Sequence, residues 1–424
     1  MQNKLESDSI IHANVLVVGA GIAGITSAVE LSEIGKKVIL VEKEPYIGGR
    51  ILQMNKYFPK MCPPSCGFEI NLKRLRTNPG IEIHTLSEVQ QITGTKGDYN
   101  VVIKKKPRFV NSNCTLCKLC EEVCPVERKN EYNYNMNNTK AAYLPFDNSF
   151  PATYVIDSET CKGVSCNECL KVCPVDAINL EEKEENLEFN VGAIIWATGW
   201  SSYNAEKLDN LGLGKFPNVV TNTLFERMAS ANGHLSGNIV RPSDNKAIEK
   251  IAFVQCAGSR DENHLPYCSS VCCMASMKQA TYVREKYPNA EIHFFFIDVR
   301  SPGRLEDFYT NLKKDNKMFF HRGKVAKIIE NKENANLIVE AENTLTTNLT
   351  VNEFDMVVLA VGMAPNVDGV DIINKSLDEN GFLKSDNIYG IIGAGVACAP
   401  RDVAGVVKEA TGAAMKAIKI LRRA

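Results

Sequence analysis

The glycine-rich turn between residues 19 and 24 constrains the fold of this chain most. A continuous run of apolar and β-branched residues, NVLVV at 14–18, leads straight into GAGIAG. Such a run is typical of a parallel strand that is covered on both faces. The helix SAVELSEIG and a second strand, KVILVEKE, follow, so Glu42 stands at the carboxyl end of that strand. This order predicts the first βαβ unit of a dinucleotide-binding fold.

Each residue type in this unit matches one requirement of dinucleotide binding. Gly19 permits the tight turn, Gly21 lets the backbone approach a pyrophosphate, and Gly24 allows close packing of the helix. The helix N-terminus offers amide donors and a favourable dipole to the phosphates, and Glu42 can bind the ribose hydroxyls. A lone glycine motif would be a weak signal. Because strand, glycines, helix and acid occur in register, we prefer a dinucleotide site to a glycine-rich turn without a ligand.

Length and charge limit the architecture and the partners. A chain of 424 residues, 44% of them hydrophobic, can bury more than one core, so two or three domains are expected. The 49 Lys and Arg nearly balance the 50 Asp and Glu, which argues against nucleic acid or an anionic membrane surface as a partner. The first residues lack a signal-peptide pattern and no apolar run is long enough to span a bilayer. We therefore expect a soluble, cytoplasmic chain without a membrane span.

Fifteen cysteines indicate metal or redox chemistry, because clustered thiols in a cytosolic chain are seldom structural disulfides. All but Cys398 fall into short-spaced groups. The groups are Cys62 and Cys66; Cys114, Cys117, Cys120 and Cys124; Cys161, Cys166, Cys169 and Cys173; and Cys256, Cys268, Cys272 and Cys273.

The second and third groups follow the bacterial two-cluster ferredoxin pattern. CTLCKLCEEVCP at 114–125 is CxxCxxCxxxCP, and CKGVSCNECLKVCP at 161–174 repeats it with a longer first gap. In this pattern three close thiolates bind one [4Fe-4S] cluster and the cysteine before the proline binds the other. Two zinc sites are the less favoured alternative, because zinc motifs usually separate two CxxC pairs. The predicted ligand sets are Cys114, Cys117, Cys120 and Cys173 for one cluster, and Cys161, Cys166, Cys169 and Cys124 for the other.

The ferredoxin-like segment interrupts the dinucleotide-binding pattern. A predicted strand, YNVVIKKKPRF, precedes it, and LEFNVGAIIWATG resumes the pattern after it. We interpret KKKPR at 104–108 as a solvated strand end rather than a docking patch, and the polar stretch 127–150 as a long loop.

The fourth group replaces a second nucleotide motif. The segment KIAFVQCAGSRDENHLPYCSSVCCMASMKQA at 250–280 begins with a strand but has no GxGxxG. Cys272 and Cys273 cannot easily pair with each other, and thiolates at a helix start gain from its dipole. From spacing alone, a third metal site and a set of buried thiols are equally plausible.

Several segments resemble two-dinucleotide-domain flavoproteins of the thioredoxin reductase type. EPYIGGR resembles the GG segment after the ribose acid, which favours FAD over NAD. GAIIWATGW (192–200) and DMVVLAVGMAPN (355–366) look like the strands by which that family leaves and re-enters the FAD domain, and the C-terminal IYGIIGAGV resembles its closing segment. The family usually has GD where this chain has GAG, so Asp402 is the candidate substitute. The predicted cofactor-binding residues are Gly19, Gly21, Ile22, Ala23, Gly24, Glu42, Lys43, Gly49, Arg50, Val89, Thr198, Gly199, Gly362 and Asp402.

A more specific resemblance covers nearly the whole chain. QCAGSRD, YCSSVCCMASMKQA and FFFIDVRSPGRLEDFY look like the A subunit of heterodisulfide reductase. GGRILQMNKYFPKMCPPSCGFEI and AAYLP resemble still more its relative, the A subunit of the quinone-interacting membrane-bound oxidoreductase complex. The resemblance implies a third [4Fe-4S] cluster on Cys256, Cys268, Cys272 and Cys273. It also places Lys278 near the flavin ring, a reading that we hold equal to an ordinary surface lysine.

The pair Cys62 and Cys66 lies where disulfide reductases carry their redox-active cysteines. A thiolate there can attack a substrate disulfide and pass on two electrons. The spacing MCPPSC differs from the usual motifs, so structural or interface thiols and additional metal ligands remain open.

Together these features predict an α/β, thioredoxin-reductase-like FAD flavoprotein with an inserted two-cluster ferredoxin domain. The expected boundaries are 1–107 and 181–200 for the FAD domain, 108–180 for the insert, 201–354 for the second dinucleotide-fold domain, and 355–424 for the last FAD part.

By resemblance, the chain is an electron-transfer oxidoreductase subunit that links the quinone pool to adenylylsulfate reductase in sulfur metabolism. The implied partners are a second flavin and iron-sulfur subunit, together with a quinone-interacting membrane subunit, which would hold the chain at the inner face of the cytoplasmic membrane. The alternatives are a heterodisulfide-reductase-like subunit that bifurcates electrons or reduces disulfides with soluble partners, an NAD(P)H-dependent reductase, and a scaffold with vestigial sites. The missing second GxGxxG argues against the reductase, and the intact motifs argue against the scaffold.

Overall fold

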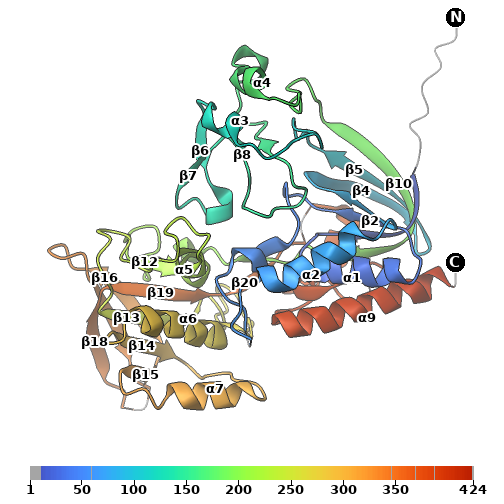
Figure 1. The fold of residues 1–424 in the computed structure, drawn as a ribbon. Coiled ribbons are helices and arrows are strands. Elements are labelled where there is room, and N and C mark those ends of the chain that lie inside the picture. The colour runs from blue at the N-terminus through green and yellow to red at the C-terminus, as the bar shows by residue number, and fades with distance from the viewer. Residues whose placement is uncertain (1–10, 59, 345, 368, 386, 423–424) are drawn as a thin grey trace, which may run out of the picture.

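The computed structural model describes residues 11–58, 60–344, 346–367, 369–385 and 387–422. Residues 1–10, which entered the signal-peptide prediction and the first FAD range, lie outside these ranges. Figure 1 shows three parts: two sheets with their helices at the right and lower left, and a smaller part above them in teal and green.

The first sheet contains the predicted βαβ unit. Its strand order is β3-β2-β1-β10-β5-β4, with β21 beside β10. Alternate side chains of β1 enter different cores: Val15 and Val17 face one, and Leu16 and Val18 face the other. Burial on both faces explains why the strand is continuously apolar. The strands are β1 Ile11–Val18, β2 Val38–Val41, β3 Ile81–His84, β4 Ser87–Thr95, β5 Asp98–Lys105, β10 Glu185–Trp196 and β21 Ile392–Gly393.

Small residues bring two helices of this domain close together. Helices α1 (Ile22–Glu33) and α9 (Val403–Leu421) pack against each other, and the Ser27 hydroxyl donates to the Ala410 carbonyl at 3.1 Å. Ala28 and Ala410 are fully buried there. Helix α2 (Ser65–Arg76) packs beside α1, and short segments complete the domain: η1 Gly49–Gln53, α8 Asp371–Asn374 and η5 Gly395–Ala397. The predicted end of the first helix at Gly35 is close to the observed end at Glu33.

The second domain is a parallel sheet with the order β12-β19-β13-β14-β15. A three-stranded antiparallel sheet, β16-β17-β18, packs into the same core. The elements are β12 Val219–Thr221, α5 Asn222–Ala229, β13 Lys250–Ala257, α6 Cys272–Lys286, β14 Glu291–Phe296, α7 Leu305–Leu312, β15 Met318–Arg322, β16 Val325–Glu330, β17 Leu337–Glu342, β18 Leu349–Phe354 and β19 Met356–Val361, with η4 Ala205–Lys207 before them.

Two short strands carry the chain between the domains. β11 (Trp200–Ser202) leaves the first domain, which is predicted to bind FAD and is here called the FAD domain. It pairs antiparallel with β20 (Met363–Pro365), which returns to that domain. The predicted boundary at residue 355 is therefore one strand too early. β19 is an apolar run like those of the first sheet, but its neighbours are β12 and β13.

The insert between β5 and β10 is held by short elements and a small core. The core contains Val110, Cys120, Ala142, Tyr154, Ile156 and Ala177, with several cysteines packed against it. The predicted long loop at 127–150 is wrong, because the chain there forms paired strands. The elements are α3 Leu119–Glu122, β6 Glu127–Lys129, η2 Glu131–Asn133, β7 Asn138–Lys140, β8 Ala142–Tyr143, β9 Val155–Ile156, η3 Gly163–Ser165 and α4 Glu168–Val172. β6 pairs with β7 and β8 pairs with β9.

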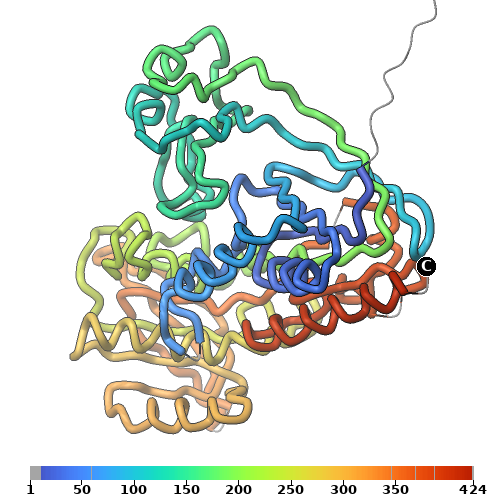
Figure 2. The backbone as a smooth tube through the Cα atoms, turned by 45° about the vertical axis from the view of Figure 1, so that its right-hand side comes forward, coloured from blue at the N-terminus to red at the C-terminus, as the bar shows by residue number. Residues whose placement is uncertain are grey.

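Strands β5 and β10 connect the insert to the FAD domain, as the tube in Figure 2 shows. The basic run at the end of β5 was predicted to be a solvated strand end, and this largely holds. Lys104 pairs with Glu184 and Lys105 pairs with Glu185. Arg108 differs: its guanidinium donates to the Pro45 carbonyl and to the Thr85 hydroxyl at 2.9 Å. Burial lowers the pKa of Arg108 to about 10. This arginine anchors the base of the insert to the FAD domain.

None of the helices in the described ranges is long and apolar enough to cross a membrane.

Candidate functional site

A cavity of about 1170 Å³ lies among the three parts of the molecule. Typical small-molecule pockets reach about 1,000 Å³, so this one has room for a ligand as large as a dinucleotide. Its wall includes most of the predicted cofactor-binding residues: Gly19, Gly21, Ile22, Ala23, Glu42, Lys43, Gly49, Arg50, Val89, Thr198, Gly199 and Asp402.

The glycine turn has the geometry that its sequence predicts. Gly19 has a φ of +98°, and a Cβ there would lie 2.4 Å from the Ala197 carbonyl oxygen. Gly24 does not line the cavity; a Cβ on it would lie 1.8 Å from the Gly19 oxygen, so it packs the helix against the turn. At Gly21 the nearest atom to such a Cβ is 4.0 Å away, so the backbone stands open to the cavity. These three roles match those expected for a pyrophosphate-binding turn.

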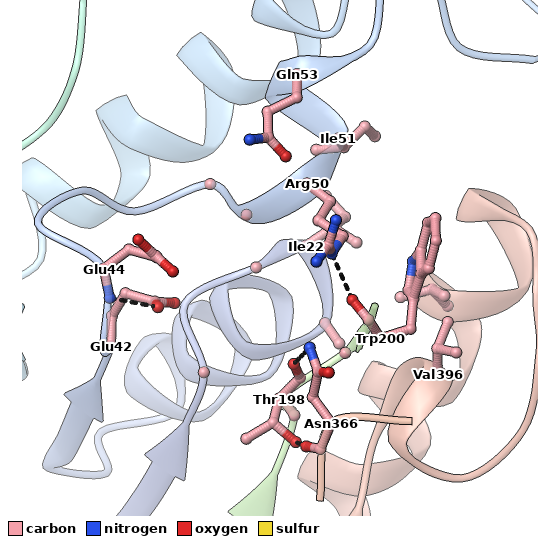
Figure 3. Close-up of a pocket in the computed structure, with 18 of the residues that line it drawn as sticks. Ile22, Glu42, Glu44, Arg50, Ile51, Gln53, Thr198, Trp200, Asn366 and Val396 are labelled. Atoms are coloured by element: carbon pink, nitrogen blue, oxygen red, sulfur yellow. Dashed lines mark hydrogen bonds between the residues drawn. The ribbon is translucent and has the colours of Figure 1, made fainter. Parts of the chain in front are cut away.

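Glu42 is buried at the end of β2. Its carboxylate accepts a hydrogen bond from the Ala20 amide at 2.7 Å. It also accepts one from the Glu44 amide at 3.0 Å, which Figure 3 shows. A carboxylate oxygen has more than one lone pair, so each can also accept from a ribose hydroxyl. Burial raises the pKa of Glu42 to about 7, although the two amide hydrogen bonds oppose this effect.

The raised pKa of Glu42 predicts a pH dependence in protein freed of cofactor. Because the folded-state pKa of about 7 exceeds the ordinary value of 4.5, the folded protein holds a proton that the unfolded chain releases between these values. The free energy of unfolding should thus fall by up to about 3 kcal/mol as pH rises from 4.5 to 7. Urea denaturation of wild type and Glu42→Gln at pH 5 and pH 8 tests this. An equal pH dependence in both proteins would contradict it.

The GGR segment approaches the glycine turn and the domain crossing. Gly48 and Gly49 both have positive φ, and a Cβ on Gly49 would lie 2.9 Å from the Gly21 Cα. The Arg50 Nε donates to the Trp200 carbonyl at 2.5 Å, and its guanidinium lies 5.3 Å from the Trp200 ring (Figure 3). Arg50 therefore ties the FAD domain to the strand that leaves it.

The crossing segments complete the cavity. The Thr198 hydroxyl donates to the Asn366 carbonyl, which joins the outgoing and returning chains (Figure 3). Trp196 also lines the cavity, and its Nε1 is a buried donor without a protein partner among the described residues. Buried donors are normally satisfied, so this one fits a ligand acceptor.

Two predicted cofactor residues have other positions or contacts. Gly362 is not on the cavity wall: a Cβ there would meet the Ser259 hydroxyl at 2.3 Å, so this glycine packs against the cysteine loop of the second domain. Asp402 is on the wall and caps α9, where its carboxylate accepts from the Gly405 amide at 2.7 Å. The N-terminus of a long helix thus faces the cavity, as expected for an anionic ligand.

In the insert, the four cysteines of the first predicted set lie together, and of the second set Cys124, Cys161 and Cys169 lie near one another. Cys114, Cys117, Cys120 and Cys173 line one small cavity, although Cys173 is distant in sequence. Burial raises the pKa of Cys169 to about 11, and its neighbours Cys161 and Cys124 raise it further. Within the described residues no three His, Cys, Asp or Glu side chains are arranged to hold a single metal ion. The ligands of a [4Fe-4S] cube bind different iron atoms and so stand further apart than the ligands of one ion.

The second domain brings its four cysteines together: Cys256 is near the end of β13, Cys268 is in the following loop, and Cys272 and Cys273 begin α6. Burial raises the pKa of Cys272, and Cys273, Cys256 and Cys268 all lie close enough to raise it further. Cys256 has a left-handed backbone with a φ of +57°, which is uncommon outside glycine. Strained residues of this kind often occur at functional sites.

Lys278 is not a surface lysine. It is buried on the cavity wall and its Nζ lies 2.6 Å from the Glu226 carboxylate. The same Nζ donates to the Lys56 carbonyl at 2.6 Å, and Glu226 also accepts from the Asn55 amide at 3.1 Å. A positive charge is thus fixed between the domains.

Cys62 and Cys66 lie outside the cavity wall. They are not joined by a disulfide, and Cys66 is exposed in the first turn of α2. Tyr57, which does line the cavity, interacts with the Cys62 thiol. Neither Cys62 nor Cys66 therefore has the direct contact with the cavity that the predicted redox-active role would use.

Sequence reasoning missed the contribution of the insert to the cavity. Tyr132 and Tyr134, an aromatic pair in a polar stretch, were the available signal. The insert residues on the wall are Arg128, Asn130, Glu131, Tyr132, Tyr134, Tyr143 and Pro145.

The fold and this cavity define an FAD-binding flavoprotein of the two-dinucleotide-domain oxidoreductase class. Residues 14–53 match the family described as FAD binding domain. Among solved structures, thioredoxin reductase of T. acidophilum aligns with a TM-score of 0.53 at 15% identity, covering 97% of this chain and 98% of that one. Bacillithiol disulfide reductase of Bacillus cereus aligns at 0.51 with 12% identity, covering 97% and 100%. These likenesses concern the fold alone.

The chain is homologous to the A subunits of CoB–CoM heterodisulfide reductases. It is 40% identical to the second of the iron-sulfur A subunits of Methanopyrus kandleri, over 98% of this chain and 66% of the relative. It is 37% identical to the iron-sulfur A subunit of Methanocaldococcus jannaschii, over 95% and 64%. It is 36% identical to the A subunit of the H(2):CoB-CoM heterodisulfide,ferredoxin reductase of Methanothermobacter marburgensis, over 97% and 65%. The chain thus spans just under two thirds of the length of these relatives.

Proposed function

We propose that the chain is an electron-transfer subunit of the heterodisulfide reductase type that holds one FAD and three [4Fe-4S] clusters. The observation that carries this proposal is the convergence of three cysteine sets with a dinucleotide cavity in one chain. Bound FAD supplies two-electron chemistry, and the clusters accept electrons one at a time.

The chain's own residues have distinct roles in this proposal. The glycine turn and the α9 N-terminus bind the phosphates, Glu42 holds the ribose, and the GGR segment positions the flavin half against β11. Lys278 provides a fixed positive charge at the cavity wall and Glu226 orients it. The cluster ligands are Cys114, Cys117, Cys120 and Cys173; Cys161, Cys166, Cys169 and Cys124; and Cys256, Cys268, Cys272 and Cys273.

Flavin and iron determination on anaerobically purified protein tests the proposal. We expect about one FAD and about twelve iron atoms per chain. Cys272→Ser should lower the iron content to about eight, because one cluster loses a ligand. Cys398→Ser is the matched control: this thiol is half-buried and belongs to no cysteine set, so the iron content should stay near that of wild type. About eight iron atoms in wild type would remove the third cluster from the proposal.

The physiological partners form a second, finer proposal. The GGRILQMNKYFPKMCPPSCGFEI segment supports placement in a quinone-interacting complex that exchanges electrons with adenylylsulfate reductase, held at the cytoplasmic membrane by partner subunits. The names of the relatives support the alternative, in which a heterodisulfide and ferredoxin are the electron partners. Anaerobic affinity purification of the tagged chain from native cells separates the two. Co-purification of a membrane subunit supports the first, and soluble heterodisulfide reductase subunits support the second.

A further inference from the structure

The segment 127–145 of the insert, here called the insert wall, closes one side of the dinucleotide cavity. Figure 1 shows its hairpin, β6 and β7, reaching from the insert toward the other two parts. Four of its residues that line the cavity lie in the turn of that hairpin: Asn130, Glu131, Tyr132 and Tyr134. A module that served only to hold clusters would not need to contribute to the flavin cavity.

Hydrogen bonds fix the insert wall to the segment that follows the GG motif. The Tyr132 hydroxyl donates to the Leu52 carbonyl at 2.9 Å, and the Gln53 side chain donates to the Tyr132 carbonyl at 3.1 Å. The Tyr134 hydroxyl donates to the Gln53 side-chain oxygen at 2.8 Å. Both tyrosines therefore contact the η1 segment, on which Arg50 also lies.

Tyr134 further contacts Arg50 itself. The Arg50 guanidinium lies 6.0 Å from the Tyr134 ring and 5.3 Å from the Trp200 ring, so both rings are near it. Tyr134 and the next residue, Asn135, both have positive φ, at 52° and 62°. A tyrosine seldom adopts this conformation, so surrounding contacts must hold it there. The turn thus places the Tyr134 ring at the cavity, although the backbone conformation of this residue is unfavourable for tyrosine.

The second domain holds the same turn from the other side. Arg227 is fully buried, and its Nε donates to the Asn133 side-chain oxygen at 2.6 Å. Its guanidinium lies 4.7 Å from the Tyr132 ring. At the other end of the wall, Cys124 lies three residues before the start of β6, and its sulfur contacts the Val126 carbonyl at 3.7 Å. The wall thus connects a proposed cluster ligand directly to the cavity.

We propose that the insert wall is part of the FAD site, with Tyr132 and Tyr134 as binding residues, and that FAD binding and ordering of the insert stabilise each other. The proposal rests on the FAD site proposed above. Coupling of this kind is reciprocal: a ligand that contacts the wall stabilises it, and an ordered wall raises the affinity for the ligand.

Two measurements on the full-length protein test this coupling. Hydrogen exchange of residues 127–145 should slow when FAD is added to the FAD-free protein. Tyr134→Ala should weaken FAD binding about tenfold, from loss of the ring contact and the hydrogen bond, and Tyr134→Phe should weaken it less. Lys140→Ala is the matched control, because Lys140 is on the same hairpin and pairs with Glu127 outside the cavity. Its FAD affinity should stay within about twofold of wild type.

The outcomes separate this inference from the proposed function. Suppose that wild type binds FAD, that the insert wall exchanges at the same rate with and without FAD, and that Tyr134→Ala binds FAD as tightly as wild type. The inference is then overturned, and the proposed flavin function stands. If wild type binds no FAD, the proposed function fails with it. Retained iron in Tyr134→Ala shows that the variant has folded.

Discussion

Replacing Gly21 with alanine is expected to weaken FAD binding more than 100-fold, or about 3 kcal/mol, while the protein remains folded. A Cβ at this position has 4.0 Å of clearance from the nearest protein atom, so the empty fold tolerates it. The same Cβ would occupy the space in which a pyrophosphate approaches the backbone. Fluorescence titration of the FAD-free protein measures the affinity, and iron content measures folding of the rest of the chain.

Gly24 provides a contrasting case in the same turn. A Cβ there would lie 1.8 Å from the Gly19 oxygen, so Gly24→Ala must displace the helix or the turn. We expect this variant to lose FAD binding. We also expect its free energy of unfolding to fall by at least about 1–3 kcal/mol. Gly412→Ala in α9 is the control and should not lose stability. A Cβ there meets nothing within 4 Å, and alanine favours a helix over glycine by about 0.5–1 kcal/mol. Normal FAD affinity in Gly21→Ala would refute the assignment of this turn to the pyrophosphate.

Local patterns in the sequence predicted the parts of the site that depend on neighbours along the chain. The strand, turn and helix around Gly19 and the position of Glu42 follow from residues within one βαβ unit, and the structure has them as expected. The cysteine spacing likewise anticipated that Cys173 lies with Cys114, because the insert repeats one motif.

Features set by distant contacts could not be predicted in this way. The stretch 127–150 is polar and resembles a loop, yet Tyr132 and Tyr134 in it donate hydrogen bonds to Leu52 and Gln53 of another domain. β19 is as apolar as a strand of the first sheet, and only its partners show that it belongs to the second. Gly362 matched a flavoprotein motif, but the cysteine loop that packs against it is specific to this second domain. In each case the deciding partner is far away in sequence.

Lys278 is the clearest example of a residue whose role depends on such a partner, and its replacement should have a large effect on stability. Glu226, in a different helix, lies 2.6 Å away, and both side chains are under 10% exposed. Lys278→Met should therefore cost about 3–5 kcal/mol, because it leaves a buried carboxylate without its cation. Urea denaturation at neutral pH measures the loss.

The double variant Lys278→Met with Glu226→Gln distinguishes this cause from a general packing defect. Removing both charges removes the unpaired carboxylate, so the double variant should be more stable than Lys278→Met alone, with a coupling energy above about 2 kcal/mol. Lys375→Met is the matched control: its Nζ also lies 2.6 Å from a carboxylate, that of Asp371, but the pair is exposed. It should leave the stability close to that of wild type, because solvent screens an exposed pair. Equal losses from Lys278→Met and Lys375→Met would mean that burial gives the Lys278 pair no special weight in the stability of the protein.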